Sequence, residues 1–352
     1  MDGETAVEDV DNMTSNEYDL YYFVQTQELE WVNYKPDGNV VNPGFPLVPG
    51  KGYLYANSES VTLTFRGVPY AGNGEVELIY EEGHPLSGWN LIGNSWYNAT
   101  ATKGERNFMS MNDSRTDLVV AEDLNIAPME GIFVYTEAEN EILQLMPGRK
   151  SGTTDERLVL NLSGSTGDVI DRVIVRLGEG STLPKLMLDE EHHTKVYVPQ
   201  EDGEYAVVNG SETNIIPVNF KASELGMYKF SVRVDNTNIS YLHLIDKVTG
   251  EDVDLLIDDT YTFVGTTTER EDRFILRLDY NTNTTESDIF AYQNGNDIVV
   301  CGEGTVRVYD LRGRFITSCE VNGVETIEAM PIGVYIFKMY GEHTKTQKIV
   351  VN

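Results

Sequence analysis

The chain has 352 residues, of which 40% are hydrophobic and 10% aromatic, enough for two or three packed domains. Its 57 acidic and 26 basic side chains give a formal net charge of −31, which disfavours nucleic acid and anionic membrane surfaces as partners. The sequence has no run of the roughly 20 apolar residues that a membrane-spanning helix needs. With two cysteines in all, it is not a disulfide scaffold.

An internal repeat organises the first 148 residues. The segment 49–55, P-G-K-G-Y-L-Y, resembles 128–134, P-M-E-G-I-F-V. Each copy follows an aromatic strand, near 21–24 and 108–111, and precedes an alternating strand closed by glycine, at 61–67 and 142–148. The second copy alone opens with G-W-N-L-I-G-N at 88–94. We therefore expect the first copy to lack this strand and residue 1 to lie inside a truncated domain.

The N-terminal end supports the same expectation. Residues 1–19 form an acidic run without the apolar core of a signal peptide. We expect residues 1–17 to be disordered or to make few contacts. The paired W-N-L and P-G-K-G-Y pattern resembles β-rich modules of large surface and secreted proteins of the Bacteroidetes phylum, which there precede a C-terminal sorting domain.

Two aromatic residues follow the G-W-N-L-I-G-N strand. Trp89 lies in the strand motif itself, where core packing is expected, whereas Trp96 and Tyr97 stand in S-W-Y-N, which predicts a turn. Exposed there, they would be a candidate platform for a glycan.

A polar hinge at 149–155 introduces a second domain of short strands. Turn residues separate the strands every 8–15 positions, a spacing typical of an antiparallel sandwich rather than of βαβ units. The segment 249–256 is expected to be a hairpin turn, and 281–287, N-T-N-T-T-E-S, a linker. The expected strands are 158–162, 172–177, 195–198, 205–208, 215–220, 227–234, 241–245, 261–264 and 274–278.

The last part of the chain alternates strands and turns to its end. Residues 306–310, V-R-V-Y-D, predict a strand that is followed by a turn at 311–314, L-R-G-R, and further strands are predicted at 333–338 and 345–351. Gly313 closes the turn at a position where a positive φ is expected. Residues 287–352 hold 8 acidic and 6 basic side chains, a net of −2, so the remaining −29 lies upstream.

These three blocks resemble the C-terminal sorting domain of type IX secretion substrates. The residues that carry the resemblance are Tyr309, Asp310, Gly313, Arg314, Gly333, Val334, Tyr335, Lys345 and Lys348. The resemblance implies export across the outer membrane by the type IX machinery and removal of the sorting domain, with cleavage expected in or near 281–287. It implies that the mature protein is released or attached to surface lipopolysaccharide.

Catalytic patterns are weak. There is no G-x-S-x-G motif, and Cys301 and Cys319 both lie in the sorting-like region. The five histidines are His84, His192, His193, His243 and His343. The run D-E-E-H-H at 189–193 is best interpreted as a solvated loop, because neighbouring strand residues point to opposite faces. Calcium is the better candidate metal. Its possible ligands are acidic residues expected in or near turns: Asp168, Asp171, Asp246, Asp252, Asp254, Asp258 and Asp259.

The sequence therefore predicts an all-β chain of tandem antiparallel β-sandwich domains with a small Ig-like C-terminal β domain. The domains are expected at 1–148, 149–282 and 283–352. The predicted function is non-enzymatic: the adhesin-like or accessory C-terminal portion of a secreted or cell-surface protein that meets a host protein or glycan. Two alternatives stay open, namely the non-catalytic tail of a secreted peptidase or glycanase and a carbohydrate-binding module.

Overall fold

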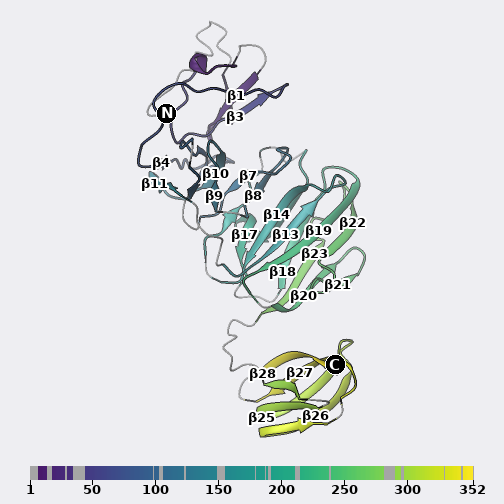
Figure 1. Cartoon of the computed structure of the whole chain (residues 1–352). Helices are drawn as coiled ribbons and strands as arrows, with labels where there is room; N and C mark the ends of the chain where they lie inside the picture. Colours follow the sequence, from purple (N-terminus) through teal and green to yellow (C-terminus); the bar gives the residue numbers. More distant parts are fainter. Residues whose placement is uncertain are drawn as a thin grey trace. The chain divides into compact units, whose positions relative to one another are not determined.

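A computed structural model describes residues 7–13, 18–27, 30–34, 44–97, 99–102, 106–122, 124–148, 155–178, 180–186, 188, 192–210, 215–237, 239–280, 290–294, 297–328, 330–341 and 344–351. The chain forms two compact units (Figure 1). The first comprises Met1–Thr237 and His243–Arg277, and the second comprises Asn238–Leu242 and Leu278–Asn352. Each unit is built from β-strands, and the fold is all-β, as the sequence predicts.

The first unit starts with a short 3-10 turn, η1 (Val7–Asp9), and a small sheet in the order β2-β1-β3. Its strands are β1 (Tyr18–Phe23), β2 (Trp31–Asn33) and β3 (Leu54–Asn57). Val7 is 1% exposed and packs with Leu20 and Tyr34. Asp11 forms a bridge to Thr64 and an ion pair with Arg66. The expectation that residues 1–17 make few contacts is thus wrong for the described segment 7–13.

The second copy of the repeat forms a four-stranded sheet in the order β5-β10-β7-β8. Two smaller pairings flank it, β11 with β4 and β12-β6-β9. The bounds are β4 (Glu75–Leu78), β5 (Trp89–Gly93), β6 (Ala101–Thr102), β7 (Met109–Met111), β8 (Leu118–Val120), β9 (Asn125–Ile126), β10 (Gly131–Tyr135), β11 (Glu141–Gln144) and β12 (Met146–Pro147).

The two copies correspond strand by strand. β3, β1 and β2 of the first copy stand in the same order as β10, β7 and β8 of the second. In the described part of the first copy, no strand takes the place that β5 holds beside β10, as the repeat predicts. Instead the outer edge of β5 meets the first copy: Gly52 N donates to Leu91 O at 3.0 Å, and Gly93 N donates to Gly50 O at 3.0 Å.

This contact explains a glycine of the P-G-K-G-Y motif. A Cβ on Gly52 would lie 2.7 Å from Ile92 O, closer than side chains approach a backbone oxygen.

The strand expected at 61–67 is absent. Among its residues only Thr64 forms a β-bridge, an isolated one with Asp11.

The larger part of the first unit is a sheet whose main path runs β21-β20-β23-β18-β16-β17-β14-β13-β19-β22, with β15 paired to β17. Figure 1 shows β14, β13, β19 and β22 side by side in teal and green. The bounds are β13 (Arg157–Ser163), β14 (Val169–Arg176), β15 (Leu183–Pro184), β16 (Lys195–Gln200), β17 (Gly203–Asn209), β18 (Ile215–Lys221), β19 (Gly226–Asp235), β20 (Ile239–Asp246), β21 (Asp252–Asp254), β22 (Thr260–Gly265) and β23 (Phe274–Tyr280).

All nine strands expected in this region form. Two short ones, β15 and β21, were not predicted.

An aromatic cluster joins strands that are distant along the sheet. The ring centroids of Phe230 on β19 and Phe274 on β23 lie 4.9 Å apart. Those of Phe263 on β22 and Phe220 on β18 lie 5.0 Å apart. The sheet therefore folds over its own core. β14 and β17 run parallel, whereas β13 is antiparallel to both of its neighbours, β14 and β19.

Buried residues from both sides of the boundary expected at 148/149 lie in one cluster. One buried cluster contains Trp89, Met109 and Phe133 from the repeat together with Val159 and Ile174 from the large sheet. Residues 149–154 of the hinge expected at 149–155 lie outside the described residues, and the three-domain division stays a prediction.

The second unit contains a five-stranded sheet in the order β24-β25-β27-β28, with β26 paired to β25. Its strands are β24 (Ala291–Asn294), β25 (Asp297–Asp310), β26 (Phe315–Ile327), β27 (Gly333–Tyr340) and β28 (Thr344–Val351). Its own core includes Val306, Val308, Phe337, Ile349 and Val351. The three strands expected from the sequence are all present, and the expected linker 281–287 lies outside the described residues.

Candidate functional site

The three blocks of the sorting-like motif lie side by side in the second unit. Asp310 at the end of β25 is paired with Tyr335 on β27, and Tyr335 is paired with Ile349 on β28. One register position along, Tyr309, Ile336 and Lys348 form the next row. Directly paired residues share a face of an antiparallel sheet. Residues of the three blocks, which are up to nearly 40 positions apart in sequence, therefore lie next to one another on three adjacent strands.

Asp310 fixes the turn between β25 and β26. Its side chain accepts hydrogen bonds from Arg312 N at 3.0 Å, from Arg314 N at 2.9 Å and from Arg314 Nε at 2.7 Å. The backbone hydrogen bond from Arg314 leads the interactions that hold the pKa of Asp310 below its usual value. Gly313 has φ +74°, so the expected positive φ is confirmed. The Y-D-x-x-G-R pattern is thus a turn motif.

The G-V-Y block sets the start of β27. Tyr335 is buried, and its hydroxyl donates to Pro331 O at 3.0 Å. Val334 is half-buried on the opposite face, and Gly333 is paired with Val351 near the end of the chain. Lys345 is half-buried and Lys348 exposed, both on β28.

One side chain of the terminal strand fastens β28 to β24. Gln347 Oε1 accepts from Phe290 N at 3.1 Å and from Ala291 N at 2.9 Å, and Gln347 Nε2 donates to Ala291 O at 2.5 Å. A side chain therefore links β28 and β24, the first and last strands of the order β24-β25-β27-β28.

The G-W-N-L-I-G-N segment is structural in character. Asn90 exchanges two hydrogen bonds with the backbone of Ile79, both at 2.9 Å. Asn94 Nδ2 donates to Ala99 O, Ile126 O and Ala127 O at 3.0–3.1 Å, and its Oδ1 accepts from Trp96 N at 3.1 Å. Both asparagines replace missing backbone partners at strand ends.

The structure corrects the expectation for Trp96. Its side chain is 9% exposed and lies edge-on to Tyr70, so its face is not available to a sugar. Burial follows from Gly74, where a Cβ would lie 2.4 Å from the indole. Tyr97 is 59% exposed, and Trp89 is buried, as expected.

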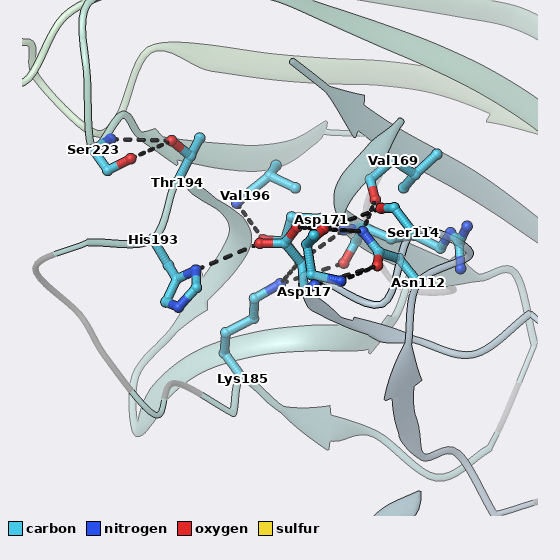
Figure 2. A network of polar contacts seen from close by, with 12 residues as sticks. Asn112, Ser114, Asp117, Val169, Asp171, Lys185, His193, Thr194, Val196 and Ser223 are labelled. Carbon is cyan, nitrogen blue, oxygen red and sulfur yellow. Dashed lines mark hydrogen bonds and ion pairs between the residues drawn. The ribbon is translucent and has the colours of Figure 1, made fainter. Parts of the chain in front are cut away.

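A polar network in the first unit was not predicted (Figure 2). It joins the repeat to the large sheet, because Asn112 Nδ2 donates to Val169 O at 3.0 Å. Within the large-sheet region, Thr194 Oγ1 lies 2.9 Å from Ser223 Oγ. At its centre Lys185 Nζ donates to Asp171 Oδ1, and Asp171 Oδ2 accepts from Val196 N at 2.7 Å.

The Lys185–Asp171 pair is buried. The side chains are 2% and 4% exposed. Burial raises the pKa of Asp171 and lowers the pKa of Lys185, and in both cases this effect outweighs the attraction between the two groups. Both shifts favour the uncharged forms.

A pocket of about 190 Å³ lies beside this pair. Its wall is mostly apolar and includes Trp31, Phe133 and Leu186, together with Asp171 and Lys185. Asp117 also lines it, 3.5 Å from His193 between Oδ1 and Nδ1.

The calcium candidates are partly corrected. Asp171 lies within β14, not in a turn, and is bound to Lys185. Asp246 ends β20 and is bound to Arg273 at 2.6 Å, with side chains 1% and 2% exposed. Asp252 Oδ1 lies within hydrogen-bond distance of His243 Nδ1, at 2.6 Å. Within the described ranges, no group of three or more His, Cys, Asp or Glu side chains could hold a metal ion.

The network escaped sequence reasoning for a definable reason. Asp171 stands in the apolar strand V-I-D-R-V-I-V, and Lys185 in L-P-K-L-M-L. An ionisable residue inside an apolar run indicates a buried charge, but it does not identify the partner of that charge. Asp171 and Lys185 are 14 residues apart, and the strand β15 between them is only two residues long.

Comparisons with known proteins leave the family open. No family model matches the chain, and no curated protein matches it. A solved structure described as "Biofilm associated protein - BSP domain" matches 80% of this chain and 67% of that chain at 11% identity, with a TM-score of 0.16. Such a TM-score supports no argument about fold or function. In the part of the chain that is described, no helix has the length and apolar character to span a membrane.

Proposed function

We propose that this chain is the C-terminal portion of a secreted or cell-surface protein, in which non-enzymatic, adhesin-like or accessory β modules precede an export signal at residues 283–352. The observation that carries the proposal is the register of the motif blocks. Tyr309, Ile336 and Lys348 are paired across three adjacent strands, which brings one residue from each of the three strands to a face that a single partner can contact.

The exposed side of the same strands suits recognition by a partner. Tyr309, Ile336 and Lys348 share a row, and Arg307 and Lys338 are paired two register positions along, on the same face. Val350 is 52% exposed beside them. Apolar groups with a few cations offer both contact area and orientation to a protein partner, and the proposed partner is the type IX secretion machinery.

The upstream modules are proposed to act by binding, at the outer-membrane surface or after release. Their asparagine-rich motif serves the backbone, as Asn90 and Asn94 show, and no hydrolytic pattern was found in the sequence. Surface lipopolysaccharide, a host protein or a glycan is the proposed class of partner.

The export proposal is tested in a Bacteroidetes host that has a type IX system. The full chain and a form lacking 287–352 are each expressed behind a signal peptide, and surface and periplasmic fractions are compared. The deletion should trap the protein in the periplasm. Truncated protein at the cell surface would refute the proposal.

A point variant separates recognition from folding. Lys348→Gln changes an exposed cation on the proposed contact face, and Lys229→Gln, on β19 in the first unit, is the matched control. Reduced export of the Lys348 variant, with circular dichroism unchanged and the control exported normally, supports recognition of this face. Glycan-array binding by the upstream modules would favour the carbohydrate-binding alternative for their role.

A further inference from the structure

We propose that Lys185 and Asp171 condense to form an intramolecular amide, an isopeptide bond, once the first unit has folded. This inference is independent of the export proposal. It assigns a covalent modification to two side chains that otherwise form a buried ion pair.

The first argument is placement. Lys185 Nζ already donates to Asp171 Oδ1, so the nucleophilic nitrogen touches the carboxyl group that it must attack. The lysine is held from its backbone, because Lys185 N donates to Glu204 O at 2.7 Å. Fixed contact of this kind gives effective concentrations of about 10⁵ M or more in well-oriented intramolecular reactions.

The second argument is the protonation state. Amide formation needs a neutral amine and a neutral carboxylic acid. Both side chains are at most 4% exposed and face a mostly apolar pocket that includes Leu186 and Phe133. Because burial disfavours both charges, a proton can pass from the ammonium to the carboxylate within the pair.

The third argument is stabilisation of the reacting carbonyl. Val196 N donates to Asp171 Oδ2 at 2.7 Å, so a backbone N–H is aimed at the oxygen that carries negative charge when nitrogen attacks. Arg172 N donates to the other oxygen, Oδ1, at 2.8 Å.

The step balances without a further reactant. The Nζ–Cγ bond forms and the Cγ–Oδ1 bond breaks. Oδ1 leaves as water, with the carboxyl proton and one amine proton, and Oδ2 remains as the amide oxygen bound by Val196 N–H. The adjacent pocket of about 190 Å³ gives the water a place to go.

Two other pairs in the first unit provide a contrast. Lys195 is 3% exposed, but its partner Glu204 is 36% exposed, so this carboxylate is in contact with water and is not enclosed together with the amine. Arg273 and Asp246 are both buried, but a guanidinium stays protonated and is not a nucleophile.

The test is the mass of the full chain, purified folded and then denatured. The unmodified wild-type sequence should be heavier than the observed protein by one water molecule. Tryptic digestion should yield one branched peptide in which 158–172 is joined to 177–195, because the modified Lys185 is no longer cleaved. Recovery of separate peptides 158–172 and 177–185, with the full sequence mass, would overturn the proposal.

Variants assign the lost water to this pair. Lys185→Arg and Asp171→Ala should each have their full sequence mass, and Lys195→Arg, the matched control, should still lose one water. Asp171→Asn should lose ammonia instead and give the same branched peptide. A water loss that persists in Lys185→Arg comes from elsewhere and refutes the assignment.

Discussion

Asp310 and Tyr335 lie directly opposite each other on β25 and β27, although 25 positions separate them in sequence. Asp310 organises the turn that ends β25, and Tyr335 is buried with its hydroxyl on Pro331 O. The pairing therefore joins a surface turn to the core of the second unit. A substitution that distorts this turn should therefore destabilise both β25 and β27.

Gly313→Val should destabilise the second unit by roughly 1–3 kcal/mol, the cost of forcing a β-branched residue into a left-handed conformation. Gly313 has φ +74°, and nothing lies within 4 Å of an added Cβ, so the loss comes from the backbone alone. Hydrogen exchange of the full chain in mild denaturant should show reduced protection in β25–β28 and unchanged protection in β13 and β14.

Gly313→Asn is the control for this substitution, because asparagine tolerates positive φ better than valine does. It should show a smaller loss of protection. If the valine variant exchanged like the wild type, the turn would not require a left-handed residue.

The local pattern of the sequence was sufficient to locate most strands. Alternation such as Phe230, Val232 and Val234 identifies a half-buried strand without tertiary information, and Gly313 follows from turn chemistry. The local pattern did not predict which side chains are buried or paired in the folded chain. Trp96 has the local features of an exposed turn, but it is buried because Gly74 leaves room for the indole ring. Likewise, nothing local pairs Lys185 with Asp171.

Arg273→Met should cost about 3–5 kcal/mol, the range for removing one partner of a buried ion pair. Arg273 contacts Asp246 through Nε at 3.0 Å and Nη2 at 2.6 Å, so the variant leaves a buried carboxylate without its cation. Urea unfolding gives the change in free energy. Arg270→Met removes a pair with Asp272 whose arginine is 83% exposed, and this control should cost about 0–1 kcal/mol. Equal losses in the two variants would contradict the argument.

The same carboxylate should make stability sensitive to acid. Burial alone would raise the pKa of Asp246, but hydrogen bonds from Arg273, Val248 N and Tyr261 outweigh it and hold the pKa below 3.8. The folded state then binds fewer protons than the unfolded state. The contribution is complete above pH 3.8 and is lost as the pH falls through the lower folded value.

Urea midpoints measured from neutral pH down through 3.8 should fall for the wild type. The fall should be shallower in Arg273→Met, because Asp246 no longer has a lowered pKa to lose. An identical pH dependence in the two proteins would show that Asp246 does not contribute to it.

Cys301 and Cys319 should remain free thiols in the folded chain. Cys319 is paired with Val306, and Cys301 lies five positions before Val306 on β25, which corresponds to roughly 16 Å along a strand. A disulfide requires Cα atoms within about 7 Å. Burial, followed by the charges of Glu325 and Glu320, raises the pKa of the Cys319 thiol, so alkylation at neutral pH should be slow there in the native state.

The test counts thiols in the unfolded chain. Because no disulfide is expected, freshly purified protein that is unfolded in alkylating reagent without reductant should carry two labels per chain. Cys301→Ser should then leave one label, on Cys319, and Cys319→Ser one label, on Cys301. Fewer than two labels on the wild type, restored by prior reduction, would mean that the register between β25 and β26 differs from the one described.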